Sequence, residues 1–168
     1  MPLSIYDASI PVFRRALHNL SAILDKADAH AAANAIDPAE LVGARLAPDM
    51  FTLAGQVQGA SDAAKICAAR LTGSEIPKFP DAEKTLAELQ DRIGKTVAYL
   101  ATFKPSQFDG SAERIVSMNM NRKPVTLEGK TYLLAFSLPN FFFHVTTAYD
   151  ILRHKGLQIG KVDYLGAF

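Results

Sequence analysis

The sequence has one cysteine, no tryptophan and no apolar run long enough to cross a membrane. Cys67 cannot form a disulfide within the chain, which is typical of proteins in a reducing compartment. No stretch approaches the roughly 18 uninterrupted apolar residues that a membrane helix needs. The N-terminus also lacks the basic segment and apolar run of a secretory signal. These absences predict a cytoplasmic protein that does not associate with membranes.

Charge of one sign is also scarce, since 18 Lys and Arg face 17 Asp and Glu for a formal net charge of +1. Such a balance excludes the strong basic field that nucleic-acid binding requires. No Gly-rich phosphate loop, CxxC, HExxH or GxSxG motif is present. The common nucleotide-binding, zinc-protease and serine-hydrolase classes are therefore not indicated, and no catalytic residue or organic cofactor is predicted. Without a repeat or an internal boundary, residues 1–168 form one domain.

Apolar residues recur at helical spacing in the segments that we expect to be long helices. These segments are 4–34, 50–73, 81–104 and 138–156. Asp37 and Pro38 predict a short helix near Pro38–Gly43, and Asp81 is expected to cap the third long helix. In the last segment Pro139 suits the first turn and Gly156 the position just past the end.

Residues 108–130 read differently, because their polar and apolar residues alternate around the turn residues Asn121 and Arg122. This pattern predicts a small β-hairpin inserted before the last helix, with Tyr132–Phe136 as an offset first turn of that helix. The fold class is therefore all-α, a four-helix bundle with one hairpin. The short connector between the second and third long helices predicts that these two are antiparallel. The hairpin segment is long enough to cross the bundle.

The tail after Gly156 is expected to fold back on the bundle, because its apolar residues need cover. These residues are Leu157, Ile159, Val162 and Leu165.

The segment 138–156, LPNFFFHVTTAYDILRHKG, concentrates the candidates for chemistry. It is apolar over more than one face, so we expect it to be wedged among other helices. Asp150 and His154 are four residues apart and share a face, as two metal ligands or a helical ion pair would. His144 lies within a run of phenylalanines, and Tyr149 lies on the apolar stripe with a hydroxyl that Gln58 could satisfy.

Several segments resemble an uncharacterised bacterial domain-of-unknown-function family placed with the DinB/YfiT-like four-helix bundles. They are LSAILDKA, LAPDMF, GQVQGASDAAK, LPNFFFHVTTAYDILRHKG and the closing GKVDYLG. The resemblance spans nearly the whole chain. It implies a DinB-like bundle with a crossover connection, which is frequently a homodimer. It also implies an optional metal site in the core, since members of this superfamily are often assigned as metalloenzymes.

Metal-binding members of that superfamily typically use one histidine of the second helix and an HxxxH pair in the last. By resemblance, His154 takes one ligand position, Asp150 stands where the earlier histidine would be, and Gln58 lies in the matching region of the second helix. One His, one Asp and one amide could hold a divalent ion such as zinc, nickel or manganese, although less selectively than three histidines.

Two classes of function follow from these residues. The first is a metal-free homodimer that binds a small ligand or acts as an interaction module. The alternative is a divalent-metal-dependent enzyme, of hydrolase or thiol-transferase type, with a degenerate site in the core. In both cases the site is expected between the second and last long helices, around Gln58, His144, Tyr149, Asp150 and His154.

Overall fold

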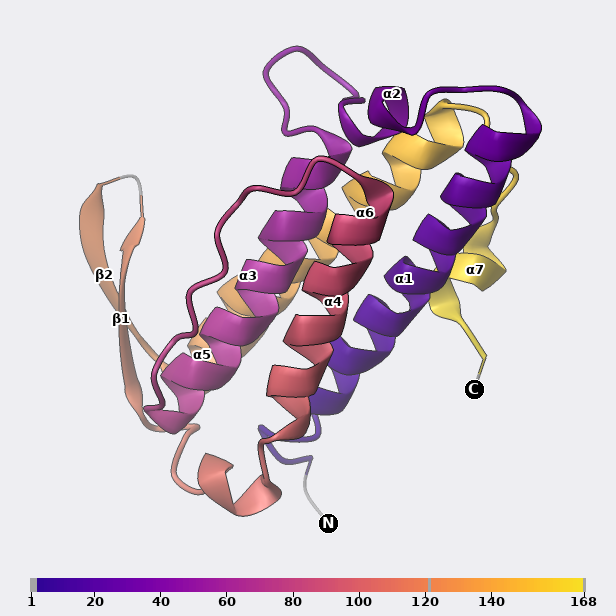
Figure 1. Ribbon diagram of the computed structural model, residues 1–168. Coiled ribbons are helices and arrows are strands. Elements are labelled where there is room, and N and C mark those ends of the chain that lie inside the picture. The colour runs from indigo at the N-terminus through magenta and orange to yellow at the C-terminus, as the bar shows by residue number, and fades with distance from the viewer. Residues whose placement is uncertain (1–2, 121, 168) are drawn as a thin grey trace.

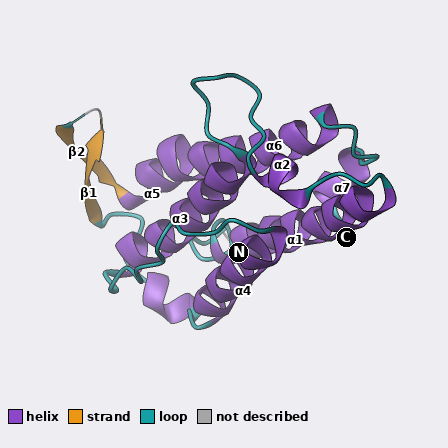
Figure 2. Ribbon diagram, turned by 45° about the horizontal axis from the view of Figure 1, so that its top comes forward, coloured by secondary structure: helices purple, strands orange, loops and turns teal. Residues whose placement is uncertain are grey.

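The computed structural model describes residues 3–120 and 122–167, and it is mostly helical. Its long helices α1, α3, α4 and α6 lie side by side, and a small hairpin stands apart at one end (Figures 1 and 2). The elements in chain order are α1 (Ile10–Ala33), α2 (Pro38–Val42), α3 (Leu53–Thr72), α4 (Leu86–Ala101), the 3-10 turn η1 (Pro105–Phe108), β1 (Ile115–Met120), β2 (Lys123–Glu128), α5 (Gly129–Thr131), the π-helix η2 (Tyr132–Ser137), α6 (Leu138–His154) and α7 (Lys161–Leu165).

The expected helices are present, with corrected starts. Helix α1 begins at Ile10 rather than near Ser4, because the Ser9 hydroxyl donates to the Ile5 carbonyl in a preceding turn. Helix α2 has the expected cap, in which the Asp37 side chain accepts from the Ala39 amide at 2.9 Å. The predicted Asp81 cap of α4 is wrong. Thr85 caps this helix instead, because Glu88 completes a capping box with it.

Helices α3 and α4 run parallel, which corrects the antiparallel prediction. Gln58 near the start of α3 contacts Glu83 just before α4, whereas Glu75 beyond the end of α3 contacts Tyr99 near the end of α4. Residues 73–85 run back along α3 (Figure 1). This connector can reach about 40 Å when extended, more than the about 30 Å length of α3. The crossover therefore lies here and not in the hairpin segment.

The hairpin is confirmed before the last helix, with β1 antiparallel to β2 and register from Ile115–Glu128 to Met120–Lys123. Of its predicted turn residues, Arg122 has a φ of 64°, and Asn121 lies outside the described residues. The expected offset first turn of the last helix is the π-helix η2, which runs directly into α6. Gly156 follows α6 with a φ of +93°, as expected for a helix stop.

The core lies between the long helices, and most of the predicted stripes are buried in it. The aromatic contact between Phe13 and Phe141 joins α1 to α6 in this core. The tail folds back so that α7 packs on α1, with Leu157 and Ile159 buried. Val162 is 80% exposed and Leu165 is 38% exposed, so the prediction of cover is wrong for these two residues. No described helix combines the length and hydropathy needed to cross a membrane.

Candidate functional site

The imidazole of His144 is held in one orientation between α6 and α3. Its Nδ1 lies 2.8 Å from the Oε1 of buried Gln56, whose own amide nitrogen donates to the Phe51 carbonyl at 3.4 Å. The amide oxygen therefore faces the ring, so Nδ1 carries the hydrogen and donates it. The Nε2 atom is left as the lone-pair nitrogen of a neutral imidazole.

Close packing fixes the plane of the same ring. A Cβ placed on Gly59 would lie 2.7–2.8 Å from three atoms of the imidazole, so the ring rests against the α3 backbone and only glycine leaves room for it. Phe51 stacks parallel to the ring at 6.3 Å, and Phe143 meets it edge-on at 5.5 Å. His144 is thus positioned from several sides.

Electrostatics keep this histidine neutral near pH 7. Burial lowers the pKa of His144 below its ordinary value, and the carboxylate of Asp62 offsets only part of that effect. A neutral, half-buried imidazole can accept a hydrogen bond or a proton at Nε2.

An ion-pair network centred on the buried Arg92 lies beside the histidine and holds α3, α4 and their connector together. Asp62 accepts from Lys65 and from Arg92, both at 2.7 Å, and Arg92 is only 1% exposed. Arg92 also pairs with Asp81 and Glu83 at 3.0 Å. Burial alone would raise the pKa of Glu83, but the Gln58 hydrogen bond and the Arg92 charge lower it overall.

Two cavities open along this side of α3 and share Gly59 and Asp62. The first, of about 220 Å³, lies against η2 and the start of α6. The second, of about 280 Å³, lies toward the connector and includes Phe51, Gln58 and Asp81. The remaining lining residues of the first are Ala63, Ile66, Arg70, Tyr132, Phe136, Ser137, Asn140 and His144. We call this first cavity the α3–α6 groove.

The structure does not bring the predicted metal ligands together. Asp150 and His154 are exposed, and they lie about 9 Å and 15 Å beyond His144 along α6. Gln58 donates to Glu83 at 2.9 Å, on the connector side of α3. Tyr149 packs edge-on against Tyr164 of α7 at 5.9 Å rather than against Gln58. Of the predicted residues, only His144 lines the α3–α6 groove.

The donor set in the groove does not fit the metal that the DinB resemblance implies. Among the described residues, no three His, Cys, Asp or Glu side chains are grouped so that they could hold an ion. The Gln56 oxygen already accepts from His144, and Asp62 is shared between two cations. A divalent ion would therefore find one uncommitted strong donor, too few for tight binding.

Sequence reasoning missed most of the groove, although a signal for it was present. Gln56, Gly59, Ala63, Ile66 and Arg70 recur at three- and four-residue spacing, and so lie along one face of α3. This polar and small stripe runs beside the apolar stripe that identified the helix. The parallel run of Tyr132, Phe136, Asn140 and His144 has the same spacing.

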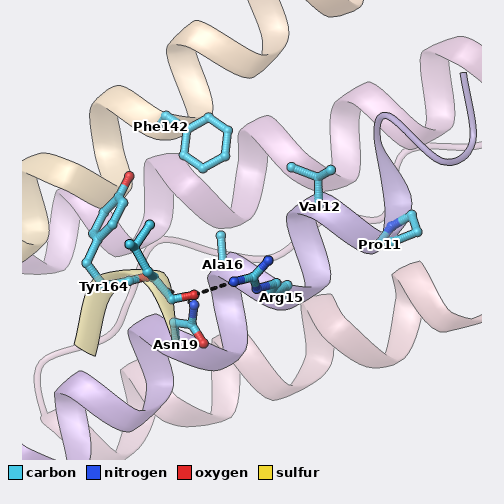
Figure 3. Close-up of a pocket in the computed structure, with 8 residues that line it drawn as sticks. Pro11, Val12, Arg15, Ala16, Asn19, Phe142 and Tyr164 are labelled. Carbon is cyan, nitrogen blue, oxygen red and sulfur yellow. Dashed lines mark hydrogen bonds between the residues drawn. The ribbon is translucent and has the colours of Figure 1, made fainter. Parts of the chain in front are cut away.

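Another cavity, of about 330 Å³, lies between α1, α6 and the tail (Figure 3). Arg15 donates to the Leu165 carbonyl at 2.7 Å, and Asn19 donates to the Tyr164 carbonyl at 3.0 Å. Its polar side chains thus serve to attach α7 to the body, and Phe142 forms part of its apolar wall. This cavity therefore offers a ligand few polar side chains that are not already used to hold the tail.

Comparisons with known proteins agree with this architecture. Residues 5–165 match the family model described as domain of unknown function DUF1993. A crystal structure of a DinB family member protein from Shewanella denitrificans is 43% identical over 98% of this chain and 93% of that chain, with a TM-score of 0.91. The curated proteins contain no match.

The fold is thus a helical one in which α3 and α4 are parallel, a crossover joins them, and a candidate site lies in the groove between α3 and α6. The chain belongs to the DUF1993 family and, with its Shewanella neighbour, to the DinB family.

Proposed function

We propose that this DinB-family protein binds a small organic molecule in the α3–α6 groove, without a resident metal. The observation that carries the proposal is the His144–Gln56 hydrogen bond, which leaves Nε2 as the acceptor nitrogen of a neutral side chain that lines the groove. We infer further that the long helices form the DinB-like four-helix bundle with a crossover, and that two copies of the chain act as a homodimer. Cytoplasmic location is part of the proposal, because Cys67 is a buried free thiol.

The groove has the composition of a small-molecule site. Ile66, Ala63 and Phe136 supply apolar walls, while His144 supplies an acceptor at one end. The groove volume of about 220 Å³ is well above the space that a single water needs. A ligand with a short apolar body and an N–H or O–H group directed at Nε2 suits this space.

The thiol in the neighbouring core is not suited to covalent chemistry. Cys67 is fully buried, and burial raises the pKa of its thiol to about 12, with Ser137 and Arg70 offsetting only part of that effect. A thiol of this kind stays protonated and inert near neutral pH. Binding through hydrogen bonds and apolar contact is therefore favoured over a cysteine-dependent reaction.

The test follows the His144 ring by NMR while 1-hexanol or hexanamide is added to untagged protein. We expect both probes to shift the ring signals at about 20 mM, above the roughly 1 mM Kd of weak specific binding. Gly59→Ala should abolish the shift, because its Cβ displaces the ring. It should also cost about 1–3 kcal/mol of stability.

Gly94→Ala is the matched control, since this α4 glycine is exposed and a Cβ there meets no atom within 4 Å. We expect it to keep probe binding and to add about 0.5–1 kcal/mol of stability. Ring signals unmoved by either probe would overturn the proposed site. Elemental analysis of the same untagged protein tests the metal alternative, and one equivalent of zinc, nickel or manganese that disappears in His144→Ala would overturn the metal-free assignment.

A further inference from the structure

The α3–α6 groove has a second polar end, where Ser137 lies about 10 Å from His144 along the helix axis. We propose that this end, formed by Arg70 and Ser137, anchors a carboxylate. The ligand class is then a small carboxylic acid whose other end carries a hydroxyl or amine that donates to His144. This assignment rests on the proposed function and specifies its ligand.

Arg70 is the cation of this end. Its Nη1 lies 3.4 Å from the Tyr132 hydroxyl, and its guanidinium carbon lies 5.8 Å from the centre of the Tyr132 ring. In the part of the chain that the structure describes, no carboxylate forms an ion pair with Arg70, whereas buried Arg92 has three such partners. A guanidinium oriented by an aromatic ring and lacking a counterion is preorganised for an incoming carboxylate.

Ser137 gives an independent sign of a ligand at the same place. Its side chain is 2% exposed, lines the groove, and has a hydroxyl without a hydrogen-bond partner of good geometry among the described residues. The Cys67 thiol and the Tyr132 hydroxyl are its polar neighbours, and both are weak substitutes for a charged acceptor. A buried hydroxyl left in this state is unfavourable, and a ligand carboxylate would satisfy it.

The π-helix η2 brings these groups to one wall. Tyr132 and Ser137 are five residues apart, which on an α-helix places them about 140° from each other. The wider π turn turns both toward the groove, where Phe136 also lies. Single π turns inside α-helices occur frequently at functional sites. The π-helix thus lies where the Ser137 hydroxyl lacks a hydrogen-bond partner and, among the described residues, the Arg70 guanidinium lacks a carboxylate partner.

The other end of the groove fixes the direction of the ligand. His144 presents a lone pair, which repels an anion and accepts from a donor, and the Asp62 carboxylate near it is already bound to Lys65 and Arg92. A bound acid therefore directs its carboxylate toward Arg70 and its hydroxyl or amine toward His144. Asn140, between the two ends on α6, can offer its amide to either.

The experiment compares 6-hydroxyhexanoate with 6-hydroxyhexanamide, which differ only in the charged end. Binding is followed by NMR at the His144 ring and by calorimetry. We expect the acid to bind wild-type protein about 10-fold or more tighter than the amide, as for a hydrogen bond to a charged group. Arg70→Gln should remove this preference, and Arg70→Lys should keep part of it. Ser137→Ala should weaken acid binding about 3-fold.

Arg45→Gln is the control, because this arginine is exposed and donates to the Pro48 carbonyl outside the groove. It should keep the full preference for the acid. Equal affinity of acid and amide for the wild type, or a preference that survives Arg70→Gln, would overturn the carboxylate anchor. If the amide still shifts the His144 ring in that case, the proposed binding function stands. If neither probe moves the ring, both proposals fail.

Discussion

At the scale of single residues, several separate contacts fix the position and the tautomer of one imidazole, that of His144. His144 has a hydrogen-bond partner that fixes its tautomer, a glycine that leaves room for its ring, and contacts with Phe51 and Phe143. A histidine that only filled space would need none of these devices in combination. These contacts are best explained if Nε2 accepts a hydrogen bond from a ligand, since the Gln56 contact at Nδ1 keeps Nε2 as an acceptor.

The neutral state of His144 predicts a pH dependence of stability. Its pKa is lowered in the folded protein by burial, whereas in the unfolded chain it is near the ordinary value of about 6.5. Between these two values the unfolded state binds more protons, so the free energy of unfolding rises with pH. The contribution is fully present above about pH 6.5 and is lost as the pH falls through the folded pKa.

Urea unfolding of the wild type and of His144→Gln between pH 5 and pH 8 measures this contribution. We expect the difference in unfolding free energy between the two proteins to change in the wild type's favour as the pH rises. Glutamine is the appropriate replacement, since it can still meet the Gln56 amide but does not titrate. Parallel curves for the two proteins across this range would contradict the neutral, buried state of the histidine.

The sequence could predict those site residues that a local pattern marks, but not those that are defined by a long-range contact. His144 stood out because a polar side chain inside a phenylalanine run must find a partner. Its partner could not be predicted, because Gln56 and Gln58 lie close together on α3 and face different directions. No local pattern indicates that Gln56, 88 positions before His144, is the one that contacts it. The spacing of Asp150 and His154 suited a metal site and an exposed helix face equally well, and both side chains are exposed.

At the scale of elements, the connector between α3 and α4 decides the topology. It is anchored by Arg92, whose guanidinium reaches Asp81, Glu83 and the Pro80 carbonyl of the connector as well as Asp62 of α3. Burial alone would lower the pKa of Arg92, but the carboxylates raise it overall. One buried side chain thus joins two parallel helices to the segment that crosses between them.

We predict that Arg92→Met destabilises the protein by about 3 kcal/mol, because it leaves Asp81 and the largely buried Glu83 without their cation. Hydrogen exchange of residues 78–84 should rise more than that of the helices, because the connector loses its anchor. Lys95→Met, an exposed substitution one turn further along α4, is the control and should change stability by less than about 0.5 kcal/mol. Equal effects of the two substitutions would show that the network does not hold the connector.

Helix positions followed from periodicity, but their mutual direction did not. The stripes in α1, α3, α4 and α6 appear in the sequence because burial selects apolar residues at every third or fourth position. A thirteen-position connector is equally compatible with a tight return and with a run back along α3, because either satisfies its length. What selects the crossover is the Arg92 network, a set of long-range ion pairs that no local pattern encodes.

At the scale of the whole molecule, the surface beside the groove carries large exposed aromatic side chains. Phe51 is 63% exposed and Phe143 is 55% exposed, and both lie next to the His144 ring. Exposed apolar side chains gathered on one surface mark interaction sites, and phenylalanine is enriched in protein interfaces. This surface is the part of the chain that best suits the proposed homodimer.

We predict that the protein is a dimer in sedimentation equilibrium at tens of micromolar, and that Phe51→Ser combined with Phe143→Ser makes it a monomer. Burying each phenylalanine contributes about 1.5–3 kcal/mol, so the pair should weaken association by 100-fold or more. Val162→Ser is the control, because this valine is 80% exposed but lies on α7. A wild type that remains monomeric at these concentrations would refute the homodimer, and a variant as dimeric as the control would place its interface elsewhere.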